Sequence, residues 1–346
     1  MKNYCMSHYL AFRFIKDENI NFAPNLTHTV YKKRDKSELV PIKTANDLSI
    51  LIKEKISQFF IPDKTAIFLS GGIDSAILAS YLPKGTKAYT FKCNAENAID
   101  ETKQARKYCE IYSLNHEIIE MNWQDFEDLM PEILRFNKVP FHSIEVQLVK
   151  AAKLAKKQGI ERLIIGESSD LVFGGMDGLL AKDWDFDEFY ARYNFIEPKD
   201  ALKDFINVKD VYESYRLANN KIDFMRFIDE IFAIESNTSY LHAFTKERIK
   251  YLDPYSFAFL AEPLNLHRVR NGEPKYIVRE LFAKRYPNLP IPHKIPMPRA
   301  MEQWLKNYNI KRPEFVPNCT SVMSGDQKWQ MYCLETFLNM LELGSL

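Results

Sequence analysis

Residues 70–75, Ser-Gly-Gly-Ile-Asp-Ser, are the segment of this sequence best suited to chemistry. They follow a short apolar run and precede an apolar segment at 76–82, a pattern that predicts a buried strand, a sharp turn and a helix. Backbone N–H groups and serine hydroxyls at such a turn favour an anion. Asp74 would repel a phosphate unless a divalent cation lay between them. The loop therefore predicts a phosphate group bound together with Mg²⁺.

A second polar run, Gly-Glu-Ser-Ser-Asp at residues 166–170, also follows an apolar segment that is typical of a strand. Glu167 and Asp170 add two carboxylates to that of Asp74. Three carboxylates around one site repel each other unless a metal ion or a proton relieves the repulsion. Asp74 and Asp170 as Mg²⁺ ligands, with Glu167 as a proton acceptor, would relieve it. An ordinary helix start rich in Ser, Glu and Asp is the alternative.

A third run, at residues 272–279, carries Lys275 and Arg279. Positions four apart lie on the same face of a helix, so both cations could grip phosphate oxygens. A solvated helix edge is the alternative interpretation of such a pair.

The segments between these runs alternate between strand and helix patterns, which predicts an α/β fold with a doubly wound, mainly parallel sheet. Ligands bind beyond the carboxyl ends of the strands in such sheets. Ser70 and Gly166 both lie at strand ends, so we expect them to face one pocket. The expected strands are 65–70, 87–92, 117–121 and 162–165, and the expected helices are 73–82, 100–114, 123–136 and 145–158.

The flanking regions are less regular. Residues 1–45 form a short lead-in in which 9–15 and 28–31 suggest two strands that could pair as a β-hairpin. The main domain is expected over 46–346, beginning with a helix after Thr44 and including a helical lobe at about 185–250. The five prolines of 287–298 predict a rigid connector, and 327–343 predicts a closing helix.

Composition narrows the class of protein. The 346 residues hold 47 Lys and Arg against 46 Asp and Glu, a net charge of +1, so we expect neither a nucleic-acid nor a membrane partner. The five cysteines are scattered without a CxxC pair, which favours a reducing, cytoplasmic setting over a zinc site or a disulfide framework. No apolar stretch reaches the length of a membrane span.

No lysine follows the glycines of 70–75, and the loop resembles that of the N-type ATP pyrophosphatases instead of the common NTPase loop. The three runs, in this order, resemble the synthetase domain of asparagine synthetase and its relatives, including β-lactam-forming cyclases, over roughly 46–343. This resemblance implies an adenine nucleotide α-hydrolase-like fold. Asp100-Glu101 resembles a further stretch of the family, and the resemblance of the second run continues to Gly175. Within that longer stretch Leu171 replaces a family Glu and Ser168 a family Gly.

The resemblance implies an AMP-forming, ATP-dependent amide ligase. It would adenylate a small-molecule carboxylate, aspartate or a related acid, and transfer the acyl group to ammonia or another amine. Glu167 and Lys275 are the implied catalytic residues, and Asp74 and Asp170 the implied Mg²⁺ ligands. The remaining expected site residues are Leu69, Ser70, Gly71, Gly72, Asp74, Ser75, Phe91, Gly166 and Arg279 for ATP, and His142, Glu145 and Lys294 for the substrate.

Several alternatives stay open. The stretch before the loop is too short for the glutaminase domain of glutamine-using members, so the amine would be free ammonia, ammonia from a separate glutaminase subunit, or a larger amine. A homodimer is a further expectation. A tRNA-modifying pyrophosphatase would adenylate a base, and would be expected to show a basic excess. A catalytically impaired partner subunit is the non-enzymatic alternative, motivated by Leu171.

Overall fold

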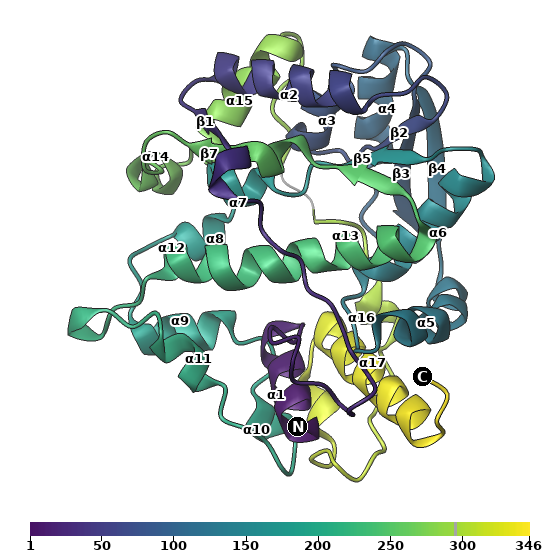
Figure 1. The fold of residues 1–346 in the computed structure, drawn as a ribbon, viewed down its shortest axis with the longest axis vertical. Helices are drawn as coiled ribbons and strands as arrows, with labels where there is room; N and C mark the ends of the chain where they lie inside the picture. The colour runs from purple at the N-terminus through teal and green to yellow at the C-terminus, as the bar shows by residue number, and fades with distance from the viewer. Residues whose placement is uncertain (294–295) are drawn as a thin grey trace.

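A five-stranded parallel sheet lies at the centre of the computed structural model, which describes residues 1–293 and 296–346 (Figure 1). Its strand order is β4-β3-β2-β5-β6, and every neighbouring pair is parallel. The first strand in the chain is central, and the chain winds outward from it on both sides, which confirms the predicted doubly wound sheet. The strands are β2 (Thr65–Phe68), β3 (Lys87–Cys93), β4 (Asn115–Met121), β5 (Arg162–Ile164) and β6 (Lys250–Leu252).

Helices cover both faces of this sheet (Figure 1). On one face α2, α3, α4 and α15 pack over a cluster that includes Ile77 and Phe282, and on the other α5, α6 and α13 pack over a cluster that includes Leu148 and Phe244. As predicted, Thr44 begins α2, because its side chain accepts a hydrogen bond from the Asp47 N–H. These helices are α2 (Ala45–Phe59), α3 (Ile73–Ala79), α4 (Thr102–Tyr112), α5 (Trp123–Asn137), α6 (Ile144–Lys157), α13 (Ala233–Glu247) and α15 (Tyr276–Arg285).

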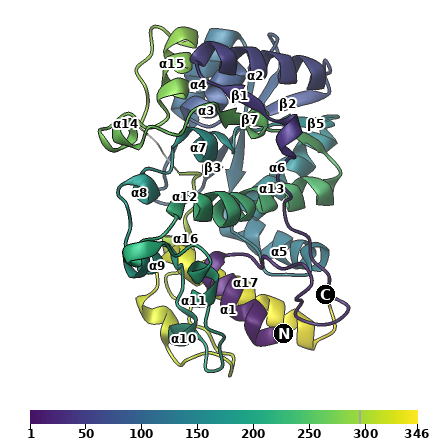
Figure 2. The same cartoon turned by 60° about the vertical axis from the view of Figure 1, so that its left-hand side comes forward.

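The region expected to form a helical lobe is helical (Figure 2). Its short helices bury an aromatic cluster that includes Phe189, Tyr212 and Phe227. A π-helical turn, Ile228–Phe232, then leads into α13, which packs against α6 and so belongs to the layer beneath the sheet. The lobe contains α8 (Asp177–Leu180), α9 (Phe186–Tyr193), α10 (Pro198–Ala201), α11 (Lys209–Glu213) and α12 (Phe224–Phe227).

The N-terminal lead-in is a helix, α1 (Lys2–Phe12), and the predicted strands at 9–15 and 28–31 are wrong. Residues 5–12 are all buried, so this helix is enclosed on every side and has no exposed polar face over that stretch. Tyr9 donates its hydroxyl to the Phe141 carbonyl at 3.0 Å, so α1 is packed into the domain and not set apart from it. The apolar run at 9–15 therefore owes its conformation to tertiary packing that a local pattern does not reveal.

The remaining elements close the molecule. β1 (Val40–Ile42) and β7 (Ala258–Leu260) form a small parallel sheet, and the closing helix α17 spans Gly325–Glu342 beside α1. The proline-rich connector contains neither helix nor strand over 287–293 and 296–298, as predicted. No helix in the described part of the chain is both long enough and apolar enough to span a membrane.

Candidate nucleotide site

The glycine- and serine-rich loop joins the end of β2 to the start of α3 (residues 73–79). Ser70 and Ser75 hold the turn closed, with their hydroxyl oxygens 2.9 Å apart and the Ser70 N–H donating to the Ser75 hydroxyl at 3.0 Å. Gly71 donates its N–H to the Glu101 carboxylate at 2.8 Å. A Cβ at Gly71 would lie 3.1 Å from the Glu101 Cβ, so a side chain here would press against Glu101.

A cavity of about 420 Å³ opens beyond the carboxyl ends of β2 and β5, the two strands at which the winding direction reverses. Its volume is in the range of small-molecule sites. Ser70 and Gly166 both line it, as predicted from their positions at strand ends. Nine of the residues expected at the nucleotide or its catalytic groups also line it: Leu69, Gly72, Asp74, Ser75, Phe91, Glu167, Asp170, Lys275 and Arg279. Gly71 lies in the loop between two of them.

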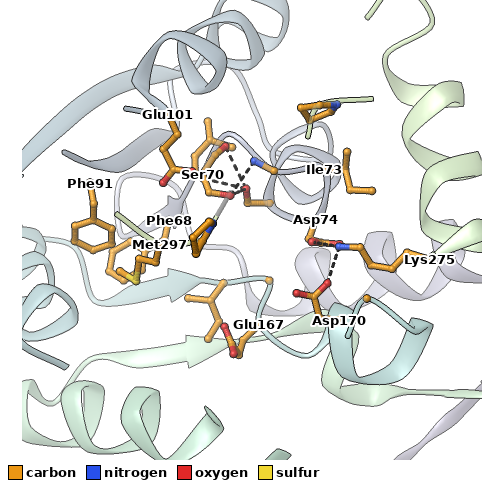
Figure 3. A pocket seen from close by; sticks show the side chains of 18 of the residues that line it. Phe68, Ser70, Ile73, Asp74, Phe91, Glu101, Glu167, Asp170, Lys275 and Met297 are labelled. Atoms are coloured by element: carbon orange, nitrogen blue, oxygen red, sulfur yellow. Dashed lines mark hydrogen bonds and ion pairs between the residues drawn. The ribbon is translucent and has the colours of Figure 1, made fainter. Parts of the chain in front are cut away.

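Asp74, Asp170 and Lys275 meet at one point of this cavity (Figure 3). The Lys275 Nζ lies 2.6 Å from Asp74 Oδ2 and 2.8 Å from Asp170 Oδ1, and Ser169 donates its hydroxyl to Asp74 Oδ1 at 2.5 Å. Burial alone would lower the pKa of Lys275, but the two carboxylates raise it above its ordinary value. Two carboxylates that are 96 residues apart in the chain are therefore held against one cation.

Gly175 makes this arrangement possible. A Cβ there would lie 1.9 Å from Asp170 Oδ1 and 2.8 Å from the Lys275 Cδ, distances that no side chain could accept. Lys275 itself differs from the sequence prediction, since it precedes α15 (276–285) with φ of 52° instead of lying within the helix. Its carbonyl accepts the Arg279 N–H at 2.8 Å, so both cations still reach the same cavity.

Glu167 lies in a different environment from the two aspartates. Burial raises the pKa of its carboxyl to about 7, against the lowering effect of hydrogen bonds from the Ser236 and Tyr240 hydroxyls of α13 (233–247). A carboxylate with a pKa near neutrality can take up a proton at physiological pH. Burial also raises the pKa of Glu101 to about 7, against the hydrogen bond from Gly71.

The two ends of the cavity differ in chemistry (Figure 3). Phe68, Phe91 and Met297 gather at one end, and the aspartates with Lys275 lie at the other. A flat apolar group would fit the aromatic end, and an anion would fit the end that carries the loop and the two cations.

His142 and Glu145, two of the three residues expected to contact substrate, do not line this cavity. Glu145 is buried, accepts a hydrogen bond from Asn137 Nδ2 at 2.7 Å and lies 3.6 Å from the His242 ring. The Nδ1 atom of His142 accepts the Ile144 N–H at 3.2 Å. His142 follows Phe141, whose carbonyl accepts the Tyr9 hydroxyl of the N-terminal helix, and Glu145 lies in the first turn of α6 (144–157). Lys294 lies outside the described residues.

Among the residues at the site that were not assigned from the sequence, four contact its loop or its carboxylates. Glu101 and Gly175 stood inside runs that carry the family resemblance, so a signal for them existed. Ser236 and Tyr240 lie on a helix whose sequence pattern shows only its apolar spacing, so nothing in the sequence set them apart. Among the residues that the structure describes, no group of three or more His, Cys, Asp or Glu is arranged to hold a metal ion.

The curated protein Amidase chry2 of Gibberella zeae is 27% identical over 134 residues, which cover 34% of this chain and 20% of that protein. The chain thus spans about a fifth of that relative's length. Among solved structures, the U34-tRNA thiolase NcsA from Methanococcus maripaludis with its 4Fe-4S cluster gives a TM-score of 0.27 at 14% identity, over 72% of this chain and 82% of that one. Such a TM-score carries no weight for fold or function.

The family model described as asparagine synthase matches residues 63–246, more than half of the chain. The matched segment contains the loop at 70–75, Glu167 and Asp170, which line the cavity described above. This chain belongs to the asparagine synthase family.

Proposed function

We propose that this protein is an AMP-forming, ATP-dependent amide ligase. It adenylates a small-molecule carboxylate, aspartate or a related acid, and passes the acyl group to ammonia or another amine. The observation that carries the proposal is the convergence of Asp74, Asp170 and Lys275 in the cavity that also holds the glycine-rich loop and Glu167. Family membership supports an ATP-using synthetase and leaves the substrates open.

We place ATP along the length of the cavity. The adenine base lies at the aromatic end beside Phe91, and the phosphates lie against the loop, Lys275 and Arg279. An oxygen of the acid's carboxylate attacks the α-phosphorus, the bond between the α-phosphorus and the bridging oxygen breaks, and pyrophosphate leaves. Lys275 offsets the negative charge that builds on the phosphate oxygens, and such preorganised charge is usually the largest contribution to catalysis.

The residues present fit a magnesium ion. Mg²⁺ is commonly bound by one or two carboxylates together with substrate phosphates, and two carboxylates converge here on a single point. Asp74 and Asp170 would hold the ion, which when bound neutralises phosphate charge. The same two carboxylates orient Lys275 toward the phosphates.

In the second step an amine nitrogen attacks the acyl carbon, AMP leaves, and Glu167 accepts the proton that the nitrogen loses. A base must be ionised and within hydrogen-bond reach to do so, and a pKa of about 7 leaves roughly half of Glu167 ionised at neutral pH. The amine is ammonia, supplied free or by a separate glutaminase subunit, or a larger amine. A homodimer in the cytoplasm is part of the same proposal.

The position of Leu171 gives little support to the alternative of a catalytically impaired partner subunit. Leu171, which replaces a family carboxylate, packs against the aromatic cluster of the helical lobe and is not among the described residues that line the cavity. For a tRNA-modifying pyrophosphatase, the net charge of +1 still offers no general attraction to RNA.

The test is pyrophosphate release by the purified protein with ATP and Mg²⁺, screened over carboxylic acids with ammonium as the acceptor. Release should require an acid, and Asp74→Asn should abolish it. Asp210→Asn, an exposed aspartate on α11 (209–213) outside the cavity, is the matched control and should leave it intact. Release that requires RNA instead of an acid would favour the tRNA-modifying alternative, and no release with any acid would contradict the proposal.

A further inference from the structure

A second polar cavity adjoins the candidate nucleotide site. It has a volume of about 580 Å³ and is lined by residues of the N-terminal helix end, the helical lobe and α17 (325–342). Gly175 lines both cavities, so they adjoin at this residue. A Cβ at Gly175 would overlap Asp170 and approach Lys275, so the second cavity adjoins the first close to these two side chains.

Two arginines line this second cavity, and none of its described lining residues is acidic. Arg192, near the end of α9 (186–193), is exposed and forms no ion pair with any carboxylate whose side chain the structure describes. Its Nη2 would lie 3.1 Å from a Cβ at Gly178, so the guanidinium lies over a residue without a side chain. The charge of Arg192 is therefore available to a ligand.

Arg13 is the other cation, and its surroundings leave part of its hydrogen-bonding capacity unused. It ends α1 (2–12) in the left-handed region, with φ of 67°, and its guanidinium lies 5.0 Å from the centre of the Phe195 ring. Glu235 accepts a hydrogen bond from Nη2 at 3.2 Å and forms an ion pair with Arg13, whereas the buried Nε finds no acceptor among the described residues. A buried donor without a partner is costly in a folded protein and commonly marks a place for a ligand or a water molecule.

The side chain of Asn194 is a neutral polar group in the wall of the second cavity. Asn194 Nδ2 donates to the Glu197 carboxylate at 2.8 Å, which fixes the orientation of the amide. Its buried Oδ1 has no hydrogen-bond donor among the described residues. The cavity thus offers two guanidinium groups and polar atoms without partners, beside the carboxylates and Lys275 of the nucleotide site.

We propose that Arg13 and Arg192 form an anion subsite for the acid substrate, which carries a second, non-reacting anionic group at the end of its chain. This inference rests on the proposed function, since it names the class of acid that would be adenylated. Guanidinium groups bind carboxylates and phosphates in bidentate fashion, so either could be the terminal anion. The carboxylate that reacts lies near Lys275, and the remote anion reaches past Gly175 to the two arginines.

Calorimetric binding tests this subsite without depending on turnover. The full-length protein, loaded with Mg²⁺ and α,β-methylene ATP, is titrated with dicarboxylates (succinate, glutarate, adipate, L-aspartate and L-glutamate), with 3-phosphonopropionate, and with butyrate and valerate. We expect at least one acid with a second anion to bind at least tenfold more tightly than the monocarboxylates. The dicarboxylate and phosphonate arms identify the terminal anion.

Variants then locate the subsite. Arg192→Gln should weaken binding of that acid at least tenfold while the affinity for the ATP analogue stays unchanged, and Arg13→Lys should weaken it through loss of the guanidinium. Arg226→Gln, an exposed arginine of the same lobe that does not line the cavity, is the control. Melting curves show whether each variant is folded.

Three results would overturn the inference: monocarboxylates binding as tightly as the acids with a second anion, no acid of the panel binding, or Arg192→Gln binding like the wild type. Tight binding that depends on Arg192, without pyrophosphate release from ATP, would instead support the subsite and contradict the proposed function.

Discussion

Glu167 gives the sharpest prediction about the two chemical steps. Replacing it with glutamine keeps the shape of the side chain and its contact with Ser236 but removes the proton acceptor. General bases contribute about 10²–10⁴ in rate. We therefore expect Glu167→Gln to slow transfer of the acyl group to the amine by about 10²–10⁴, while acid-dependent exchange of labelled pyrophosphate into ATP changes only a few-fold.

The pH dependence follows from the environment of the same carboxyl. Since burial raises the pKa of Glu167 to about 7, the wild-type transfer rate should fall about tenfold per pH unit below 7. The Ser236 hydroxyl lowers that pKa by donating to the ionised form. A hydrogen bond to a charged group contributes about 1.5–3 kcal/mol, and one pKa unit corresponds to about 1.4 kcal/mol. Ser236→Ala should therefore move the midpoint upward by about one to two units.

The assay is single-turnover transfer from preformed acyl-adenylate, with the concentration of free ammonia held constant across the pH range. In Glu167→Gln the transfer rate should lose the pH dependence that is centred near pH 7. The reasoning would be refuted if Glu167→Gln slowed pyrophosphate exchange as much as transfer, or if Ser236→Ala left the midpoint in place.

Three further predictions concern the loop and the paired charges. Gly175→Ala should abolish binding of MgATP in calorimetry, because its Cβ would overlap Asp170 Oδ1; tight binding by this variant would contradict the observed packing. Lys275→Met should leave the Asp74 and Asp170 carboxylates without their shared cation, so Mg²⁺ alone should raise the melting temperature of this variant more than that of the wild type; an equal rise would count against these ligands. Burial raises the pKa of Glu101 to about 7, against an ordinary 4.5, so between these pH values the folded state keeps a proton that the unfolded chain has released. The stability of the nucleotide-free protein should therefore fall as the pH rises from about 4.5 to 7. Glu101→Gln should flatten that part of the profile in urea unfolding, and an unchanged slope would exclude this carboxyl as its source.

The parts of the fold that the sequence predicted are those that local rules determine. The central strands and their following helices show clear apolar periods, and the turn between β2 and α3 is closed by local hydrogen bonds between Ser70 and Ser75. Parallel topology then brings strand ends together, so Asp74 and Asp170 could be placed in one pocket without any contact being known. Their pairing with Lys275 agrees with that expectation.

The parts that the sequence did not predict depend on packing between distant segments. The apolar run at 9–15 suggested a strand, but residues 9–12 complete a buried helix that packs beside α17, more than 300 residues away. His142 follows Phe141, whose carbonyl accepts the Tyr9 hydroxyl of the same N-terminal helix. Ser236 touches Glu167 only because the sheet layer brings α13 beneath the site, and no periodic signal marks such a residue.

Transfer of an oxygen isotope tests the central claim most directly. The acid that supports pyrophosphate release is prepared with ¹⁸O in its carboxylate and incubated with the protein, ATP, Mg²⁺ and ammonium, and the nucleotide product is examined by mass spectrometry. Attack of the carboxylate on the α-phosphorus predicts AMP that carries one ¹⁸O atom for each amide formed. Formation of ADP, or of AMP without the label, would contradict adenylation at this site.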